Sequence, residues 1–207
     1  MQAIARINKE PEARRAELLD VARQLFSSVG YEKTMIVDIT KKAGVAKGTF
    51  YYYFPTKEAV LEAILIDHAT GLVGEFKSIS SNFAAPQKLQ LFIECLFSPN
   101  HIENIFNNLW AEKQFELFYI ICKNSDAIFN VVLSDIIKQG NQDGSLQVIL
   151  IDETISFLWN TLNCLWEAIC NKEPAEMFSG KVKIAEMIIE RIFGIAEGTF
   201  ALPITPR

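Results

Sequence analysis

Residues 36–57 read IVDITKKAGVAKGTFYYYFPTK, and this stretch is the most informative part of the sequence. Its apolar spacing predicts two short helices, which are separated at Gly44 and ended by Pro55. Glycine adopts a backbone conformation that a β-carbon opposes, so Gly44 suits a tight turn between the helices. Two short helices joined by a glycine-containing turn are typical of a helix-turn-helix, whose second helix enters the major groove of DNA.

The second of these helices has the residue types of a DNA contact. Phe50 and Phe54 are four residues apart, so they share a face and are expected to pack inward. The three tyrosines 51–53 point in directions about 100° apart, so at least one phenol must face solvent or a partner. Lys47 can reach a base or a phosphate, and Gly48 lets a DNA backbone come close.

Outside this stretch the chain also reads as helical, and no convincing β-pattern is present. The spacing of apolar residues predicts helices at 12–29, 57–79, 87–97, 102–122, 126–140, 152–171 and 180–197. The expected fold class is all-α, with an N-terminal three-helix helix-turn-helix domain and a larger C-terminal helical domain. The turn-like segment 80–86 suggests the boundary, which gives domains 1–56 and 80–207 linked by the helix 57–79.

Charge is unevenly distributed along the chain, although the whole carries −5. Residues 1–60 contain ten basic and seven acidic residues, a net charge of +3. The remainder contains ten basic and eighteen acidic residues, a net charge of −8. A basic head on an acidic body points to a polyanionic partner for the head. The 15 phenylalanines suggest a large apolar interior, a cavity or a subunit interface.

Cysteine and histidine usage points away from metal sites and catalysis. The four cysteines form no C-x-x-C pair and the chain has two histidines, so no metal site is expected. No glycine-rich phosphate loop or nucleophile motif appears, so we expect no catalytic residue, no cofactor and no enzyme. The N-terminus lacks a continuous apolar signal region, and no apolar run approaches the ~18–20 residues that span a bilayer. A cytoplasmic protein without membrane contact is therefore expected.

The segment from Arg14 to Leu65 resembles the DNA-binding domain of the TetR family of transcriptional regulators. The residues that carry the resemblance are Gly30, Tyr31, Thr34, Ile39, Ala43, Gly44, Val45, Lys47, Gly48, Thr49, Tyr51, Tyr52, Tyr53, Phe54 and Lys57. The resemblance implies that the helix near 47–53 enters the major groove. The DNA-binding residues expected on this basis are Lys47, Gly48, Thr49, Tyr51, Tyr52, Tyr53, Lys57 and Thr34.

This chain departs from the family pattern at two positions. Many relatives have Thr or Ser where Met35 stands, and use it to cap the helix and contact phosphate. Met35 can do neither, so Thr34 is expected to cap the helix instead. Many relatives also have Ser where Ala46 stands, and the missing hydroxyl removes one possible phosphate contact. Both departures leave the operator sequence open.

The resemblance also implies roles for the C-terminal body, each with plain core packing as the alternative. The two last helices are expected to form a dimer interface through Leu158, Leu162, Leu165, Trp166, Ile188 and Ile192. An effector pocket is expected among Phe92, Trp110, Phe115, Phe118, Tyr119, Cys122 and Trp159. Glu112 and Glu116 lie one turn apart. If either faces inward, it favours a cationic or polar effector, because a buried carboxylate needs a partner; the alternative is a solvated face.

The function expected from these features is a ligand-responsive, sequence-specific DNA-binding transcriptional regulator. It would act as a homodimer on a palindromic operator, because helix-turn-helix dimers read two half-sites through a two-fold axis. Most relatives repress, so release from the operator by an unknown small molecule is the expected mechanism, transmitted by the helix 57–79. The alternatives are an all-helical enzyme and a ligand-binding or scaffold dimer that has lost DNA binding.

Overall fold

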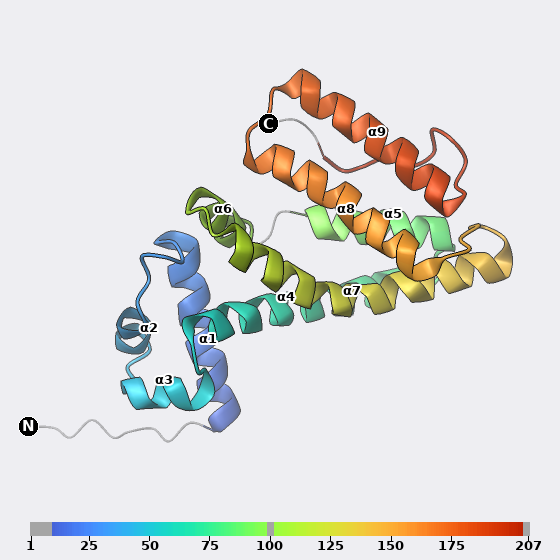
Figure 1. Ribbon diagram of the computed structural model, residues 1–207. Coiled ribbons are helices and arrows are strands. Elements are labelled where there is room, and N and C mark those ends of the chain that lie inside the picture. Colours follow the sequence, from blue (N-terminus) through green and yellow to red (C-terminus); the bar gives the residue numbers. More distant parts are fainter. Residues whose placement is uncertain (1–9, 99–101, 205–207) are drawn as a thin grey trace, which may run out of the picture. The chain divides into compact units, whose positions relative to one another are not determined.

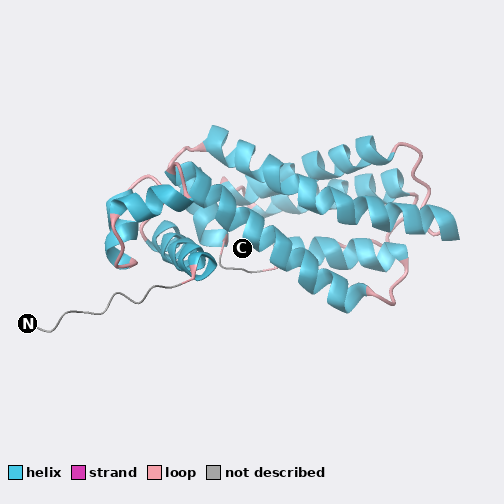
Figure 2. Cartoon of the chain, turned by 90° about the horizontal axis from the view of Figure 1, so that it is seen from below, coloured by secondary structure: helices cyan, strands magenta, loops and turns pink. Residues whose placement is uncertain are grey.

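The computed structural model describes residues 10–98 and 102–204. Within these ranges the chain forms helices and no strand, as Figure 2 shows, so the expected all-α fold class is confirmed. The helices are α1 (Pro11–Ser28), α2 (Ile36–Lys42), α3 (Lys47–Tyr53), α4 (Lys57–Ser80), α5 (Ala85–Phe97), α6 (Glu103–Ala111), α7 (Phe115–Asp143), α8 (Ile151–Cys170) and α9 (Ala175–Phe193). Figure 1 labels them in chain order.

The helices divide into two compact units. Unit 1 comprises Met1–Asp67 and Asn100–Cys122, and unit 2 comprises His68–Pro99 and Lys123–Arg207. This division does not follow the boundary expected near residues 80–86, because α6 and the start of α7 pack with the N-terminal helices. The sequence could not reveal this association, since no local signal links residues 102–122 to α1.

Unit 1 is built around α1, whose apolar stripe packs against the two short helices and the start of α4. Its buried side chains come from six helices and the segments beside them, and include Leu18, Ala22, Phe26, Tyr31, Ile39, Phe50, Phe54, Leu61, Ile64, Ile102, Ile105, Leu109 and Ile121. The expected inward face of Phe50 and Phe54 is therefore confirmed. The expected turn is also present, because Gly44 has φ +66° and no side chain crowds it. Its glycine is required by backbone conformation.

Unit 2 packs α5, α8 and α9 with the parts of α4 and α7 that belong to it. Its core contains a chain of edge-on aromatic contacts, in which Phe92 packs against Phe76 and Phe129. Trp159 continues this chain at 5.8 Å from Phe129, and its indole N–H donates to Asn130 Oδ1. Helices α8 and α9 lie side by side and are joined by a short connection (Figure 1).

Two expected helix boundaries were wrong. The break expected at Asn124–Asp126 is absent, because α7 is continuous from Phe115 to Asp143. The interruption lies earlier, between α6 and α7, where Lys113 has φ +58°. The final helix was expected at 180–197, but α9 begins at Ala175 after Pro174 and ends at Phe193, before Gly194 with φ +68°.

Candidate DNA-binding site

Helix α3 presents one polar and aromatic face to solvent. Tyr52 is 78% exposed and Tyr51 is 45% exposed, whereas Phe50 is fully buried. The Nζ of Lys47 lies 5.8 Å from the ring centroid of Tyr51, and the rings of Tyr52 and Tyr53 meet edge-on at 4.9 Å. The core thus fixes α3 through Phe50 and leaves Lys47, Tyr51 and Tyr52 facing outward.

Gly48 lies on the exposed side of α3 without a packing reason for being glycine. A β-carbon at this position would meet no atom within 4 Å, and the backbone φ lies outside the left-handed region. Glycine in an exposed helix costs about 1 kcal/mol relative to alanine. A bare backbone here suits close approach by another molecule, which is what a groove-binding helix needs.

Lys57 has different surroundings from Lys47, although both were expected to contact DNA. Its Nζ donates to the carbonyl oxygens of Tyr31 at 2.9 Å and Thr34 at 3.2 Å, and it also lies 3.4 Å from the carbonyl oxygen of Glu32. The same ammonium lies 4.1 Å from the centroid of the Tyr31 ring. Lys57 therefore anchors the loop between α1 and α2, a role that the sequence pattern did not indicate.

Tyr31 and Glu58 form the second anchor of this loop. The phenol of Tyr31 donates to Glu58 Oε1 at 2.8 Å. Burial and this hydrogen bond to Glu58 raise the pKa of Tyr31 far above its usual value. A backbone hydrogen bond and the Tyr31 phenol lower the pKa of Glu58. The pair is thus a neutral phenol and a charged carboxylate at neutral pH.

Thr34 lies inside unit 1. It is 1% exposed, and its hydroxyl donates to the Gly30 carbonyl oxygen at 2.6 Å. The N-terminus of α2 is instead served by Asp38, whose carboxylate accepts from the Met35 backbone N–H at 2.9 Å. The expected cap by Thr34 is therefore not formed, and we leave Thr34 out of the proposed DNA contacts. Thr49 and Tyr53 are half-buried.

The residues expected to line one effector pocket fall into separate units. Trp110, Phe115 and Phe118 form an aromatic cluster in unit 1, with ring centroids 4.8 Å and 6.1 Å from Trp110. Also in unit 1, Tyr119 is exposed and Cys122 is half-buried. Phe92 and Trp159 belong to the aromatic chain of unit 2. The effector pocket stays a prediction.

The two carboxylates considered for this pocket have other surroundings. Glu112 Oε2 accepts from the backbone N–H of Glu32 at 3.0 Å, so its partner is a loop of the helix-turn-helix. Glu116 is exposed. Burial raises the pKa of a different carboxyl group, that of Asp126, to about 6.

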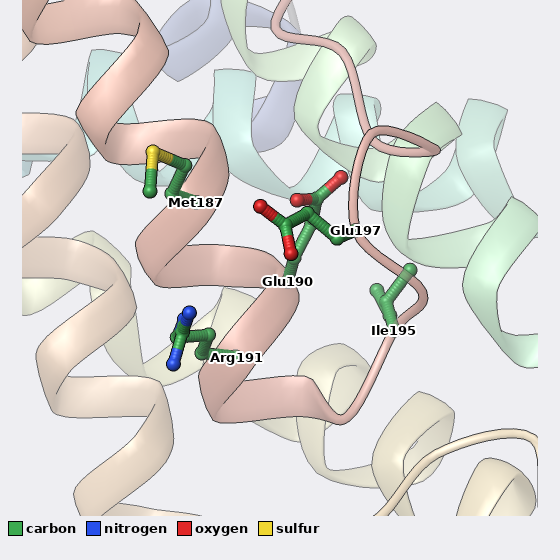
Figure 3. A pocket seen from close by; sticks show the side chains of 5 residues that line it. All are labelled: Met187, Glu190, Arg191, Ile195 and Glu197. Carbon is green, nitrogen blue, oxygen red and sulfur yellow. The ribbon is translucent and has the colours of Figure 1, made fainter.

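A pocket of about 190 Å³ lies in unit 2, between the end of α9 and the segment that follows it. Figure 3 shows its lining residues Met187, Glu190, Arg191, Ile195 and Glu197. The carboxylate of Glu190 is already engaged, because Oε1 accepts from the backbone N–H groups of Thr199 and Phe200 at 2.9 Å. This pocket contains none of the residues expected to bind the effector.

The residues expected at the dimer interface have mixed surroundings. Leu158, Leu162 and Leu165 are buried in the core of unit 2, and Trp166 and Ile192 are half-buried. Ile188 is 37% exposed. The exposed apolar side chains of the same two helices are Phe157 on α8 and Met177, Ile184 and Ile188 on α9. The surface that a partner could cover is thus largely a different set of residues.

In residues 10–98 and 102–204, no group of three or more His, Cys, Asp or Glu side chains is placed to hold a metal ion. Within the same ranges, none of the helices combines the length and apolar character needed to cross a bilayer.

Comparison with known proteins places the candidate site in context. A family model described as "Bacterial regulatory proteins, tetR family" matches residues 18–64. The transcriptional repressor KstR2 of Mycolicibacterium smegmatis is 27% identical over 160 residues, covering 73% of this chain and 77% of the relative. A repressor of the same name from Rhodococcus jostii is 38% identical over 66 residues, only 32% of each chain.

Solved structures of similar fold extend over most of the chain. The regulator FadR of Bacillus subtilis in complex with stearoyl-CoA is 20% identical, with a TM-score of 0.63, covering 84% of this chain and 97% of that one. A regulator from Saccharomonospora viridis in complex with choline is 19% identical, with a TM-score of 0.64, covering 89% and 98%. At these identities the likeness concerns the fold.

Proposed function

We propose that the chain is a member of the TetR family of bacterial regulatory proteins, and that it is a homodimeric repressor that a small molecule releases from a palindromic operator. KstR2 is a transcriptional repressor, and the regulator FadR of similar fold holds stearoyl-CoA, which supports a ligand-responsive DNA-binding regulator. The single observation that carries the proposal is the face of α3, where Lys47, Tyr51 and Tyr52 stand outward on a helix held by Phe50. Gly48 leaves the backbone of that face open.

The proposed DNA contacts are Lys47, Gly48, Thr49, Tyr51, Tyr52 and, at the edge of the face, Tyr53. Lys47 and the tyrosine hydroxyls supply hydrogen bonds to phosphates and base edges. Lys57 stabilises the DNA-binding site without contacting DNA, because its ammonium donates to carbonyl oxygens of the loop between α1 and α2. The proposed partner is double-stranded operator DNA. Because the protein must reach this DNA, we propose that it is cytoplasmic.

The homodimer is supported by the exposed apolar residues of α8 and α9. Phe157 is 64% exposed and Ile184 is 56% exposed, and large apolar side chains are normally covered when several lie together. A two-fold axis through this face would give the paired helix-turn-helices that a palindromic site requires.

The effector is an unknown small molecule, and the two liganded neighbours differ widely in chemistry, one holding stearoyl-CoA and the other choline. Repression is supported by the names of the relatives. The effector needs to change operator affinity about 5–150-fold, which corresponds to a coupling of ~1–3 kcal/mol.

The test is selection of bound fragments from the DNA of the source organism. The wild type is compared with a Lys47→Ala/Tyr52→Ala variant and with Lys138→Ala, which removes an exposed lysine of α7 as a control. We expect wild type and control to enrich the same near-palindromic site, and the α3 variant to enrich none. Equal enrichment by all three proteins, or none by the wild type even at low salt, would refute the proposal.

A further inference from the structure

We propose that Asn108 and Glu112, at the end of α6, are positioning residues for DNA binding because they hold the loop that leads into the helix-turn-helix. This inference rests on the proposed function for its DNA-binding readout. The loop comprises residues 29–35, between α1 and α2, and is called the α1–α2 loop below. All of the contacts involved lie within unit 1.

Asn108 serves the C-terminus of α1. Its Nδ2 donates to the carbonyl oxygens of Phe26 at 2.9 Å and Ser27 at 3.1 Å. The last carbonyls of a helix have no partner within the helix, so they need one from outside. Here a side chain about 80 residues later in the chain supplies it and fixes where α1 ends.

Glu112 holds the next part of the loop. Its Oε2 accepts from the backbone N–H of Glu32 at 3.0 Å. Its Oε1 lies so close to Gly30 that a β-carbon there would collide with it. Gly30 is buried and has φ +101°, so the backbone conformation requires glycine, and the carboxylate occupies the space beside it. Beside it, Gln114 Nε2 donates to Glu32 Oε1 at 2.7 Å.

The α1–α2 loop is thus held from two sides. Lys57, at the start of α4, binds carbonyl oxygens of the loop, and Glu112 binds one of its N–H groups. The loop continues directly into α2, whose first turn begins after Met35. Because α2 and α3 are joined by the tight turn at Gly44, a shift of the loop moves the DNA-contacting helix with it.

The turn between α6 and α7 is strained where it makes these contacts. Lys113 lies between Glu112 and Gln114 and has φ +58°, a conformation that a side chain opposes. The turn is closed by hydrogen bonds from the Lys113 and Gln114 N–H groups to Trp110 and Leu109. Such conformations persist only when surrounding contacts impose them.

Residues 108–114 lie outside the stretch 18–64 that the family model matches. The DNA-binding unit of this chain therefore extends beyond its recognisable motif. The aromatic cluster of Trp110, Phe115 and Phe118 has members on both sides of the turn between α6 and α7. A ligand that shifts this cluster would therefore alter the hydrogen bond between Glu112 and the α1–α2 loop. This gives effector binding a direct route to the α1–α2 loop.

The test compares Glu112→Ala with two reference variants. Glu116→Ala removes an exposed carboxylate of the neighbouring helix turn and matches the change in charge. Glu112→Gln keeps an oxygen that can accept from Glu32. Hydrogen exchange of the backbone amides of residues 30–35 is measured without DNA, and operator affinity is measured separately, with the melting temperature as the monitor of global stability.

We expect Glu112→Ala to speed exchange in the α1–α2 loop and to lower operator affinity roughly tenfold, the scale of a lost hydrogen bond to a charged group. Glu112→Gln should restore most of both, and Glu116→Ala should resemble the wild type. Wild-type exchange and affinity in Glu112→Ala would overturn the proposal, as would faster exchange spread evenly over unit 1. If the wild type binds no DNA, the proposed function fails. Hydrogen exchange of the α1–α2 loop still tests whether Glu112 holds the loop.

The variant Lys113→Gly distinguishes the effect of the Glu112 side-chain contact from the effect of the backbone conformation of the turn between α6 and α7. Glycine accepts the left-handed conformation and leaves Glu112 and Asn108 in place. We expect wild-type exchange in the loop and operator affinity no weaker than that of the wild type. A loss as large as that of Glu112→Ala would show that the backbone of the turn, and not these two side chains, positions the loop.

Discussion

Lys47 and Lys57 carry the same charge, ten residues apart, but face different partners. Lys47 is exposed at the start of α3, and its ammonium lies near the ring of Tyr51. Lys57 is bound to carbonyl oxygens of the α1–α2 loop. The first is placed to meet DNA, and the second stabilises the fold that holds it.

Lys47→Ala should weaken operator binding and leave stability unchanged. Loss of one phosphate contact reduces the slope of log K against log salt by about 1. Titration of operator DNA at several salt concentrations measures this slope. An unchanged slope would mean that Lys47 does not meet phosphate.

Lys57→Met should show the opposite pattern. It removes a charged donor from buried or half-buried carbonyls, so the free energy of unfolding is expected to fall by about 2 kcal/mol. The salt slope of DNA binding should keep its wild-type value, because no phosphate contact is lost. Urea denaturation measures the first quantity, with Lys47→Ala as the matched control. A reduced salt slope of DNA binding with an unchanged free energy of unfolding would instead show that Lys57 contacts DNA.

Asp126 makes stability depend on pH in a defined window. Burial raises its pKa from 3.8 to about 6, against a smaller opposite effect of Lys123. Between these values the folded state keeps a proton that the unfolded state has lost, so the contribution of Asp126 to stability falls as pH rises. Asp126→Asn should therefore match the wild type near pH 4 and exceed it by about 1 kcal/mol at pH 7, allowing for partial exposure. Urea denaturation at both pH values checks this difference; equal stabilities at pH 7 would contradict it.

At the scale of elements, the C-terminal segment 195–204 is held by side chains and forms no strand or helix. Glu190 accepts two of its N–H groups, and Glu186 Oε1 accepts from Leu202 at 2.8 Å. These bonds place Phe200 and Leu202 in the core of unit 2. A glutamate inside the apolar stripe of α9 was the one sequence signal for this arrangement.

Glu190→Ala should lower the free energy of unfolding by about 2–3 kcal/mol, because two backbone donors lose a charged acceptor. Glu197→Ala, an exposed carboxylate of the same segment, is the matched control and should change little. Urea denaturation measures both. If the two variants lose stability equally, net charge rather than the hydrogen bonds would be responsible.

For the molecule as a whole, the proposed dimer rests on the exposed apolar residues of α8 and α9. Ile184→Asp should yield monomers and reduce operator affinity at least tenfold, because a single helix-turn-helix contacts only one half-site. Ile79→Asp, at an exposed apolar position near the end of α4, is the control. Light scattering gives the oligomeric state. A dimer that survives Ile184→Asp would place the interface elsewhere.

Features that depend on neighbours along the chain could be predicted from the sequence. The turn at Gly44, the inward pair Phe50 and Phe54, and the outward tyrosines all follow from backbone conformation and helical spacing. The all-α fold class followed from the same periodicity. These predictions succeeded because the responsible forces act over a few residues.

The partner that each side chain contacts depends on how the helices pack. Apolar residues occur on two faces of α8, so the spacing could not tell the core residue Leu158 from the exposed Phe157. The burial of Thr34, the binding of Lys57 to the α1–α2 loop and the reach of Glu112 to Glu32 depend on contacts between distant segments. Such contacts leave no local pattern, because their geometry exists only once the helices have packed.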